Sequence, residues 1–381
     1  AHVLGEKITR PRPTDLKQVP PGAHALTREW LTAALCEDCP GAEVTQIFVG
    51  HANEGTTSRR AIIVDYNATG RDAGLPTRIF CKSSATFLSR LVTGLSGAAA
   101  AEVGFYNDVR PLLNVEAADC YQAGSHPRSK RATLILEDVA ATRGVSWPDP
   151  RDTYVDRPLA ESMVDMMATY HGTLWNDRRL SQWSWLPTAE QFQIGVNETI
   201  DFEKRSMVGV ERSEAFVPAE FAARRSEIYP CLMRSLELHR DRPQTFLHQD
   251  VHLRNWYMTA DRRMGLFDWQ CCARGLWALD FAYAMMGALT VEDRRAWERE
   301  LLVRYLEQLA AAGGEAPSFD QAWLDYRQQV FHGLIFWLYT IGAGKLQPEM
   351  QPLKVSEANV ERMAHAVIDL ESFDAFGGSH V

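Results

Sequence analysis

Four polar residues in the stretch FLHQDVHLRNWYM (246–258) have types and spacing that could do chemistry. They follow the pattern His248-x-Asp250-x-His252-x-x-Asn255, and bulky apolar residues surround them. Polar groups in an apolar setting need hydrogen-bond partners or a function. Three kinds of structure are compatible with the pattern: a satisfied structural network, a metal site and a catalytic loop.

The catalytic-loop interpretation gains support from an acid further along the chain, Asp268, in the apolar stretch MGLFDWQ. Phosphoryl transfer from ATP to a hydroxyl needs an aspartate for the hydroxyl proton, oxygen ligands for Mg²⁺ and a lysine on the phosphates. Asp250 suits the first role, and Asn255 and Asp268 offer carboxylate and amide oxygens that suit Mg²⁺. The separation of Asp250 and Asn255 equals that in the kinase catalytic loop H-R-D-x-x-x-x-N.

Two other interpretations of the same loop stay open at this point. His248 and His252 have a four-residue spacing that allows zinc binding on a helix, but a third ligand of standard spacing is missing. Asp and Asn also favour turns because their side chains bond to nearby backbone. The FDWQ stretch at its distance from the loop is what favours phosphoryl transfer.

A lysine that could bind phosphates, and a glutamate that could pair with it, occur earlier in the chain. Lys82 lies in RIFCKSS (78–84), which reads as a strand, and Glu102 follows twenty residues later in a helical stretch. A kinase needs this order, a strand lysine on the phosphates and a glutamate on the next helix. A lysine at a strand end is more often solvated, and Glu102 could be an exposed helix acid. The downstream motif favours a functional pair.

A nucleotide would be expected under the hairpin predicted for residues 44–67. Gly55 and Thr56 lie in its turn, where small residues let backbone N–H groups approach phosphate oxygens. The turn VGHANEGTTS lacks the full G-x-G-x-x-G pattern, so an ordinary hairpin turn explains it equally well. The stretch LILEDV (134–139) is the expected connection between lobes. Adenine would contact backbone groups there, around Glu137 and Val139, although a plain strand exit is the alternative.

The helices and strands expected to position these residues indicate an α+β protein with two lobes and a protein-kinase-like order of elements. The first lobe, 1–138, is a small β-rich nucleotide-binding lobe with one main helix and an N-terminal arm. The second, 139–381, is large and mostly helical and carries the catalytic loop and the substrate site. The hydrophobic periodicities predict these segments: a helix over 27–35, strands within 44–67, 78–84 and 131–139, a helix over 97–113, helices over 157–177 and 188–240, short strands in TFLHQD and MGLFDW separated by a turn with TADRR, and helices after Ala278.

Composition excludes several classes of protein. The 381 residues are 46% hydrophobic and 23% charged, as in soluble globular proteins. A net charge of −9 argues against a nucleic-acid binder. Seven cysteines are spread without a disulfide pattern and are expected to be reduced packing residues. No secretory h-region or bilayer-spanning run is visible. We therefore expect a cytoplasmic protein with no membrane contact and no obligate protein partner.

The combined motifs resemble the aminoglycoside phosphotransferase and choline kinase superfamily, which has a protein-kinase-like fold. Within it, the chain is most similar to the ecdysteroid-kinase-like and related bacterial phosphotransferases. The resemblance runs from about residue 44 to 290 and is carried by these segments: CK at 81–82, EVGFY at 102–106, LILEDV at 134–139, HQDVHLRN at 248–255, FDWQ at 267–270 and LDFAY at 279–283.

The resemblance implies a role for each matching residue, with ATP and Mg²⁺ as cofactors. Asp250 would be the catalytic base, Asn255 and Asp268 the magnesium ligands, Lys82 the phosphate-binding lysine and Glu102 its partner. Asp280 in LDFAY would brace the catalytic loop. His252 stands where protein kinases commonly carry lysine, so it could touch the γ-phosphate or only organise the loop.

The loop departs from the related pattern HGDLHPGN at Leu253 and Arg254. Arg254 could meet a phosphate or a substrate carboxylate, although a solvated arginine is the simpler interpretation. No essential group is missing.

The acceptor is expected to be a hydroxyl-bearing small molecule with apolar surface, bound against the helical lobe. The aromatic-rich segment 323–344 could line its pocket, although core packing explains such a stripe more often. A protein kinase is the first alternative, but no D-F-G and A-P-E pair with an activation segment is recognisable. A non-catalytic nucleotide-binding regulator is the second, and the set of catalytic groups argues against it.

Overall fold

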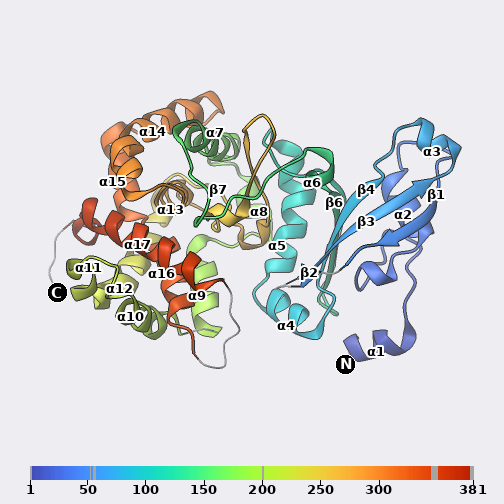
Figure 1. Cartoon of the computed structure of the whole chain (residues 1–381), viewed down its shortest axis with the longest axis horizontal. Helices are drawn as coiled ribbons and strands as arrows, with labels where there is room; N and C mark the ends of the chain where they lie inside the picture. Colours follow the sequence, from blue (N-terminus) through green and yellow to red (C-terminus); the bar gives the residue numbers. More distant parts are fainter. Residues whose placement is uncertain (1, 52, 55–56, 200, 345–350, 378–381) are drawn as a thin grey trace. The chain divides into compact units, whose positions relative to one another are not determined.

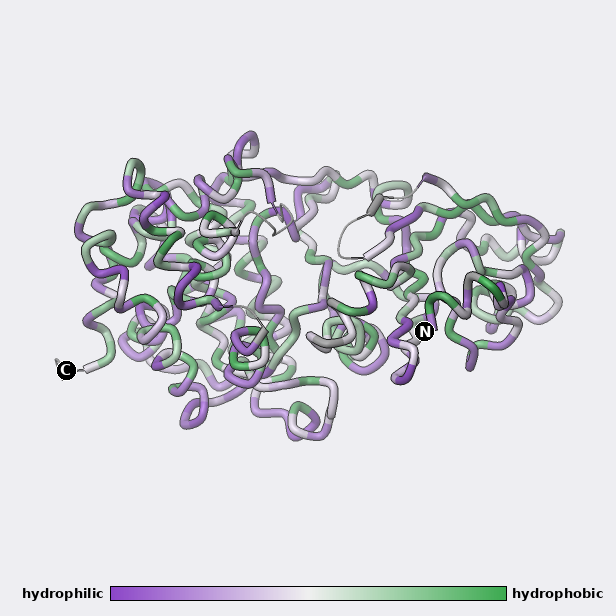
Figure 2. Tube along the Cα trace, turned by 90° about the horizontal axis from the view of Figure 1, so that it is seen from below, coloured by the Kyte–Doolittle hydropathy of each residue, from purple (hydrophilic) through white to green (hydrophobic). Residues whose placement is uncertain are grey.

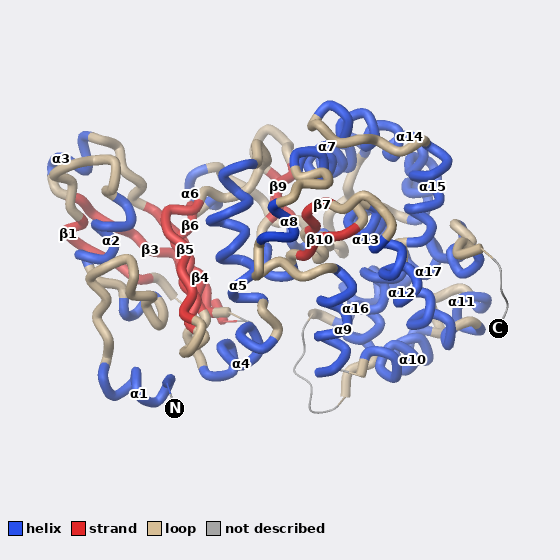
Figure 3. Tube along the Cα trace, turned by 180° about the vertical axis from the view of Figure 1, so that it is seen from behind, coloured by secondary structure: helices blue, strands red, loops and turns tan. Residues whose placement is uncertain are grey.

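The computed structural model describes residues 2–51, 53–54, 57–199, 201–344 and 351–377. The chain divides into a small unit, Ala1–Leu112 with Ala117–Val145, and a large unit, Leu113–Glu116 with Ser146–Val381. Strands form the centre of the small unit, and helices make up most of the large unit (Figures 1 and 3). The predicted α+β class, with a β-rich part followed by a larger helical part, is confirmed.

The small unit is built on an antiparallel sheet with strand order β1-β3-β4-β6-β5, and β2 pairs with β3. The strand β5 was not predicted, because CYQAGSH has no clear alternation of apolar and polar residues and lies at a sheet edge. The strands have these bounds: β1 Val44–Val49, β2 Asn53–Glu54, β3 Ser58–Tyr66, β4 Arg78–Ser83, β5 Cys120–His126 and β6 Arg131–Glu137.

Helix α2 (Arg28–Leu35) covers one face of this sheet. Thr27 caps this helix, which the sequence predicted over 27–35, and its hydroxyl accepts a hydrogen bond of 3.1 Å from the N–H of Trp30. Trp30 lies in a buried cluster with side chains from four strands, among them Ile62 and Cys81. Because side chains alternate along a strand, the residue after Cys81 must face the opposite side of the sheet.

Helix α5 (Ala98–Gly104) packs against β5 and β6 and receives the side chain that follows Cys81. The predicted helix over 97–113 is irregular at its end, where it continues as a π-helical turn, Phe105–Val109, and a 3₁₀ turn, Arg110–Leu112. The sheet thus lies between α2 and α5 (Figure 1). The small unit also has these helices: α1 His2–Thr9, α3 Ala68–Asp72, α4 Phe87–Leu95 and α6 Val139–Thr142.

The core of the large unit is α13 (Ala278–Ala288), in which every residue is buried. It packs against α7, α14, α15, α16 and α17. The other helices have these bounds: α7 Arg157–Thr173, α8 Arg179–Gln182, α9 Ala189–Thr199, α10 Phe202–Ser213, α11 Ala219–Ala223, α12 Ile228–Glu237, α14 Val291–Ala311, α15 Phe319–Gln328, α16 Phe331–Ile341 and α17 Leu353–Asp369.

Two short strand pairs flank the loop that contains His248, Asp250, His252 and Asn255. Strand β7 (Thr245–Leu247) pairs with β10 (Ala273–Gly275), and β8 (Trp256–Met258) pairs with β9 (Met264–Leu266). The TADRR turn therefore joins β8 to β9, and the strands in TFLHQD and MGLFDW do not pair with each other. Between β7 and β8 runs the loop that contains the opening motif.

Hydrophobic and hydrophilic stretches alternate along the chain (Figure 2). No helix in the described part of the chain combines the length and the apolar character that crossing a bilayer requires.

Candidate active site

Asp280, a buried residue of α13, fixes the loop between β7 and β8 by hydrogen bonds. Its Oδ2 accepts hydrogen bonds of 2.7 Å from the N–H of His248 and from the Tyr170 hydroxyl, and its Oδ1 accepts one of 2.9 Å from the N–H of Gln249. Burial opposes ionisation of Asp280, but its interactions with His171, His248 and Tyr170 outweigh burial and lower its pKa. An ionised carboxylate thus bonds two successive backbone amides of the loop, as the sequence motif implied.

Asp250, the candidate base, is oriented by donors on both carboxylate oxygens. Asn255 Nδ2 donates to Asp250 Oδ2 at 2.9 Å and to its backbone carbonyl at 2.8 Å. The Tyr283 hydroxyl lies 3.4 Å from Oδ1, and His252 Nε2 lies 3.6 Å from it. The Asp250 side chain is 28% exposed, so a hydroxyl can reach it. This is the geometry required of a positioned proton acceptor.

His252 is buried, and burial lowers its pKa although Asp250 favours the charged form. The imidazole is therefore neutral near pH 7. Its Nδ1 has no hydrogen-bond partner among the described residues. A neutral ring cannot supply the positive charge that a lysine supplies at the same place in a protein kinase. The structure thus favours loop organisation, the second of the two roles considered for His252.

His248 connects the catalytic loop to the segment that carries Asp268. Its Nε2 lies 3.0 Å from the carbonyl oxygen of Phe267, and its Nδ1 accepts a hydrogen bond of 3.2 Å from the N–H of Asp250. The Phe267 N–H in turn donates to the carbonyl of Asn255 at 3.1 Å. These bonds bring the loop residue Asn255 beside the residue that precedes Asp268.

Asn255 and Asp268 fit the ligand set that Mg²⁺ requires. The Asn255 amide nitrogen faces Asp250, so the oxygen that could bind a cation is its Oδ1. Asp268 adds a carboxylate, and it lies near enough to His252 to act on that residue's pKa. Mg²⁺ keeps several waters and accepts one or two such protein oxygens. The described residues contain no group of three or more His, Cys, Asp or Glu side chains arranged to hold a metal ion.

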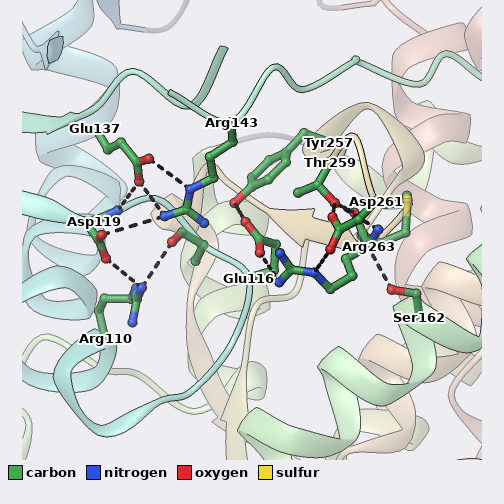
Figure 4. Close-up of polar contacts among 12 residues, drawn as sticks. Arg110, Glu116, Asp119, Glu137, Arg143, Ser162, Tyr257, Thr259, Asp261 and Arg263 are labelled. Atoms are coloured by element: carbon green, nitrogen blue, oxygen red, sulfur yellow. Dashed lines mark hydrogen bonds and ion pairs between the residues drawn. The ribbon is translucent and has the colours of Figure 1, made fainter. Parts of the chain in front are cut away.

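Glu116, which was not singled out from the sequence and whose side chain is 8% exposed, supports the hairpin that joins Asn255 to Asp268 (Figure 4). Glu116 accepts hydrogen bonds from the Tyr257 hydroxyl at 3.1 Å and from Arg263 Nη1 at 2.5 Å. Its backbone carbonyl accepts one of 3.1 Å from the N–H of Leu266. Glu116 thus contacts both strands of the hairpin. It lies about 140 residues before them in the sequence, so no local pattern reveals the contact.

In the small unit, Lys82 and Glu102 form an ion pair with a distance of 2.7 Å between Nζ and Oε1. Their side chains are only 6% and 4% exposed, so the lysine is not solvated and the glutamate is not a surface helix acid. A buried pair of this kind is costly to desolvate and contributes little stability over an apolar pair, which makes a functional reason for its presence more plausible.

The two residues expected to lie along adenine are Glu137, the last residue of β6, and Val139, at the start of α6. The Glu137 carboxylate accepts hydrogen bonds from Arg143 Nε, at 2.9 Å, and Arg143 Nη2, at 2.5 Å (Figure 4). It also accepts one from the Thr142 hydroxyl. Burial opposes ionisation of Glu137, and these hydrogen bonds outweigh it and lower the pKa. Its side chain is thus committed to the protein. Val139 is the first residue of α6, where a backbone N–H has no intrahelical partner.

Two predicted site residues, Gly55 and Thr56, lie outside the described residues. Arg254, which had no assigned role, is hydrogen-bonded to Gln351 and lies 3.8 Å from Asp149. These contacts provide a structural role for a side chain that departs from the related loop pattern.

The large unit has a surface cavity of about 390 Å³. Acidic and basic side chains line it, including Glu116, Asp165, Arg263 and Arg304. None of the predicted site residues is among its lining residues. The cavity therefore does not identify the acceptor site.

Comparison with known proteins matches residues 146–327 to a family model described as the phosphotransferase enzyme family. No curated protein matches the chain. Among solved structures, a microcompartment-associated aminopropanol kinase is 12% identical, with a TM-score of 0.49 and 90% of this chain and 96% of that chain covered. A choline kinase from Cryptosporidium parvum Iowa II is 14% identical, with a TM-score of 0.49 and 88% and 93% covered. These structural likenesses are too distant to indicate a substrate.

Proposed function

We propose that this chain, whose residues 146–327 match a family model described as the phosphotransferase enzyme family, transfers the γ-phosphate of ATP to the hydroxyl of a small molecule with the help of Mg²⁺. The observation that carries the proposal is the arrangement around Asp250. A partly exposed carboxylate is oriented by Asn255, beside the segment that ends in Asp268. A structural network alone would not leave its central acid accessible.

Each group has a task in the proposed reaction. Asp250 accepts or orients the proton of the attacking hydroxyl, and Asn255 keeps the carboxylate in place. Asn255 Oδ1 and the Asp268 carboxylate would hold Mg²⁺, which neutralises charge on the β- and γ-phosphates when bound. In the small unit Lys82 binds the phosphates and Glu102 orients it. Glu137 and Val139 contact adenine through their backbone groups.

The neutral state of His252 limits what it does in this reaction. It lies close to Asp250 Oδ1 and stabilises the loop conformation, without contributing a positive charge to the phosphate. The proposal places the protein in the cytoplasm. It requires no nucleic acid, membrane or protein partner.

A screen for phosphotransfer tests the proposal. ATP labelled in the γ-phosphate is incubated with Mg²⁺ and a panel of hydroxyl compounds: amino alcohols, hexoses, aminocyclitols and hydroxysteroids. Label should appear in at least one small-molecule product. Label in a generic protein substrate alone would instead favour a protein kinase. Nucleotide binding without any transfer or hydrolysis would favour a non-catalytic regulator.

A further inference from the structure

Gln249 lies between His248 and Asp250, and its side-chain amide is buried without a partner. The residue is 2% exposed, and neither Nε2 nor Oε1 has a hydrogen-bond partner among the described residues. Leaving a buried polar group unpaired costs about 1–3 kcal/mol. Nearly all buried polar groups in proteins do have partners, so this amide calls for a reason.

The backbone of Gln249 adds a second cost at the same position. Its φ is 65°, in the left-handed region that costs a residue other than glycine roughly 1–2 kcal/mol. The conformation is held at both ends, because the N–H donates to Asp280 Oδ1 at 2.9 Å and the carbonyl lies 3.0 Å from His332 Nε2. Glycine would adopt it freely and would carry no amide. Strain and an unpaired group next to a candidate base point to function.

His332 contacts the backbone of Gln249, and Tyr283 contacts the neighbouring Asp250. The ring of His332 from α16 lies 6.1 Å from that of Tyr283, whose hydroxyl reaches Asp250. Both His332 and His252 are buried, and the Nδ1 atom of each has no hydrogen-bond partner among the residues that the structure describes. The segment around Asp250 thus has three buried polar groups without partners and several aromatic rings.

We propose that the Gln249 amide hydrogen-bonds a polar group of the acceptor next to the hydroxyl that Asp250 activates, and that it selects among acceptors. This inference rests on the proposed phosphotransfer. It specifies an acceptor with a second hydroxyl, carbonyl or amine near the reacting hydroxyl and with an apolar portion that contacts the rings of α13 and α16. A site that hydrogen-bonds a substrate group rejects analogues that lack the group, because the site is then left unpaired.

The first arm of the test measures stability and needs no acceptor. Gln249→Met keeps the length of the side chain and removes the amide, so thermal unfolding should occur at or above the wild-type temperature. Gln329→Met is the matched control. Gln329 is also buried, but its amide bonds His239 Nε2 at 3.0 Å and the Ser235 carbonyl at 2.9 Å, so this variant should unfold at a lower temperature. A loss in Gln249→Met as large as that in the control would overturn the inference, since the amide would then have a structural partner such as a buried water.

The second arm measures acceptor use with the panel named above. For each compound that the wild type phosphorylates, Gln249→Met should lower kcat/KM for the acceptor at least about 10-fold and leave the KM for ATP unchanged. Equal acceptor kcat/KM in both proteins would contradict the inference and leave the proposed function intact. If the wild type binds Mg²⁺ and ATP but phosphorylates no compound, the unfolding comparison alone decides. If it binds no ATP, the proposed function fails and the inference fails with it.

Discussion

At the scale of single residues, Asp268 occupies a backbone conformation that few residues other than glycine adopt, with a φ of 65°. Gln249 also has a φ of 65°, and it directly precedes Asp250, the candidate base. The shared conformation is consistent with backbone strain at a functional site, where surrounding structure imposes it. The proposed role of Asp268 as a Mg²⁺ ligand can be tested separately from turnover.

Asp268→Ala should abolish the dependence of ATP binding on Mg²⁺, because it removes the carboxylate ligand. Calorimetric titration with ATP, with and without Mg²⁺, measures this. Asp261→Ala is the control, since Asp261 lies on the turn of the same hairpin and its side chain is 62% exposed. Asp261→Ala should bind as the wild type does. The metal role of Asp268 is wrong if Mg²⁺ strengthens ATP binding equally in Asp268→Ala and the wild type.

At the scale of elements, the buried helix α13 positions the catalytic loop through Asp280. Both of its carboxylate oxygens accept hydrogen bonds, and two of the donors are backbone N–H groups. Asp280→Asn should lower the free energy of unfolding by about 1–3 kcal/mol, because the amide nitrogen that replaces one carboxylate oxygen cannot accept the hydrogen bonds made to that oxygen. Urea unfolding measures the loss, and turnover should fall with it. Asp320→Asn, an exposed acid in the first turn of α15, should leave both unchanged. Wild-type stability in Asp280→Asn would refute the bracing role.

Many of the helices and strands could be predicted from the sequence, because local patterns of apolar and polar residues indicate them. The strand of Lys82 and the helix of Glu102 follow from short-range periodicity, and the pairing of Lys82 with Glu102 was expected from the motif order. Long-range contacts were not accessible. The hydroxyl of Tyr170 reaches Asp280 across 110 residues, and nothing in the local pattern of α7 indicates it. The strand pairs β7–β10 and β8–β9 were missed for a related reason, since three-residue strands give too little periodicity to show their partners.

At the scale of the whole molecule, the large unit buries four histidines whose pKa is lowered by burial: His171, His239, His252 and His332. For His239 burial lowers the pKa to about 4. In the unfolded chain a histidine has a pKa near 6.5, so the unfolded state binds protons that the folded state does not. The contribution of these neutral histidines to the free energy of unfolding is therefore fully present above about pH 6.5 and is lost as the pH falls toward 4.

His239 should account for roughly 3 kcal/mol of that loss, at about 1.4 kcal/mol for each unit of pKa shift. Urea unfolding of the wild type should give a lower free energy at pH 5 than at pH 7.5. In His239→Gln the difference should shrink, because a titrating group is removed, although the variant starts from a lower stability. His51→Gln, at an exposed position, should keep the wild-type dependence. A wild-type free energy that does not change between the two pH values would contradict this account of the core.

The central claim is that Asp250 is the base of a phosphotransferase, and its most direct test is the turnover of Asp250→Ala. With an acceptor identified by the screen, transfer of labelled γ-phosphate is measured for both proteins at saturating ATP and Mg²⁺. Far-UV circular dichroism and the ATP dissociation constant establish that the variant is folded and binds nucleotide. The account predicts that kcat falls by about 10²- to 10⁴-fold while ATP affinity is retained. Transfer by Asp250→Ala at the wild-type rate would contradict it.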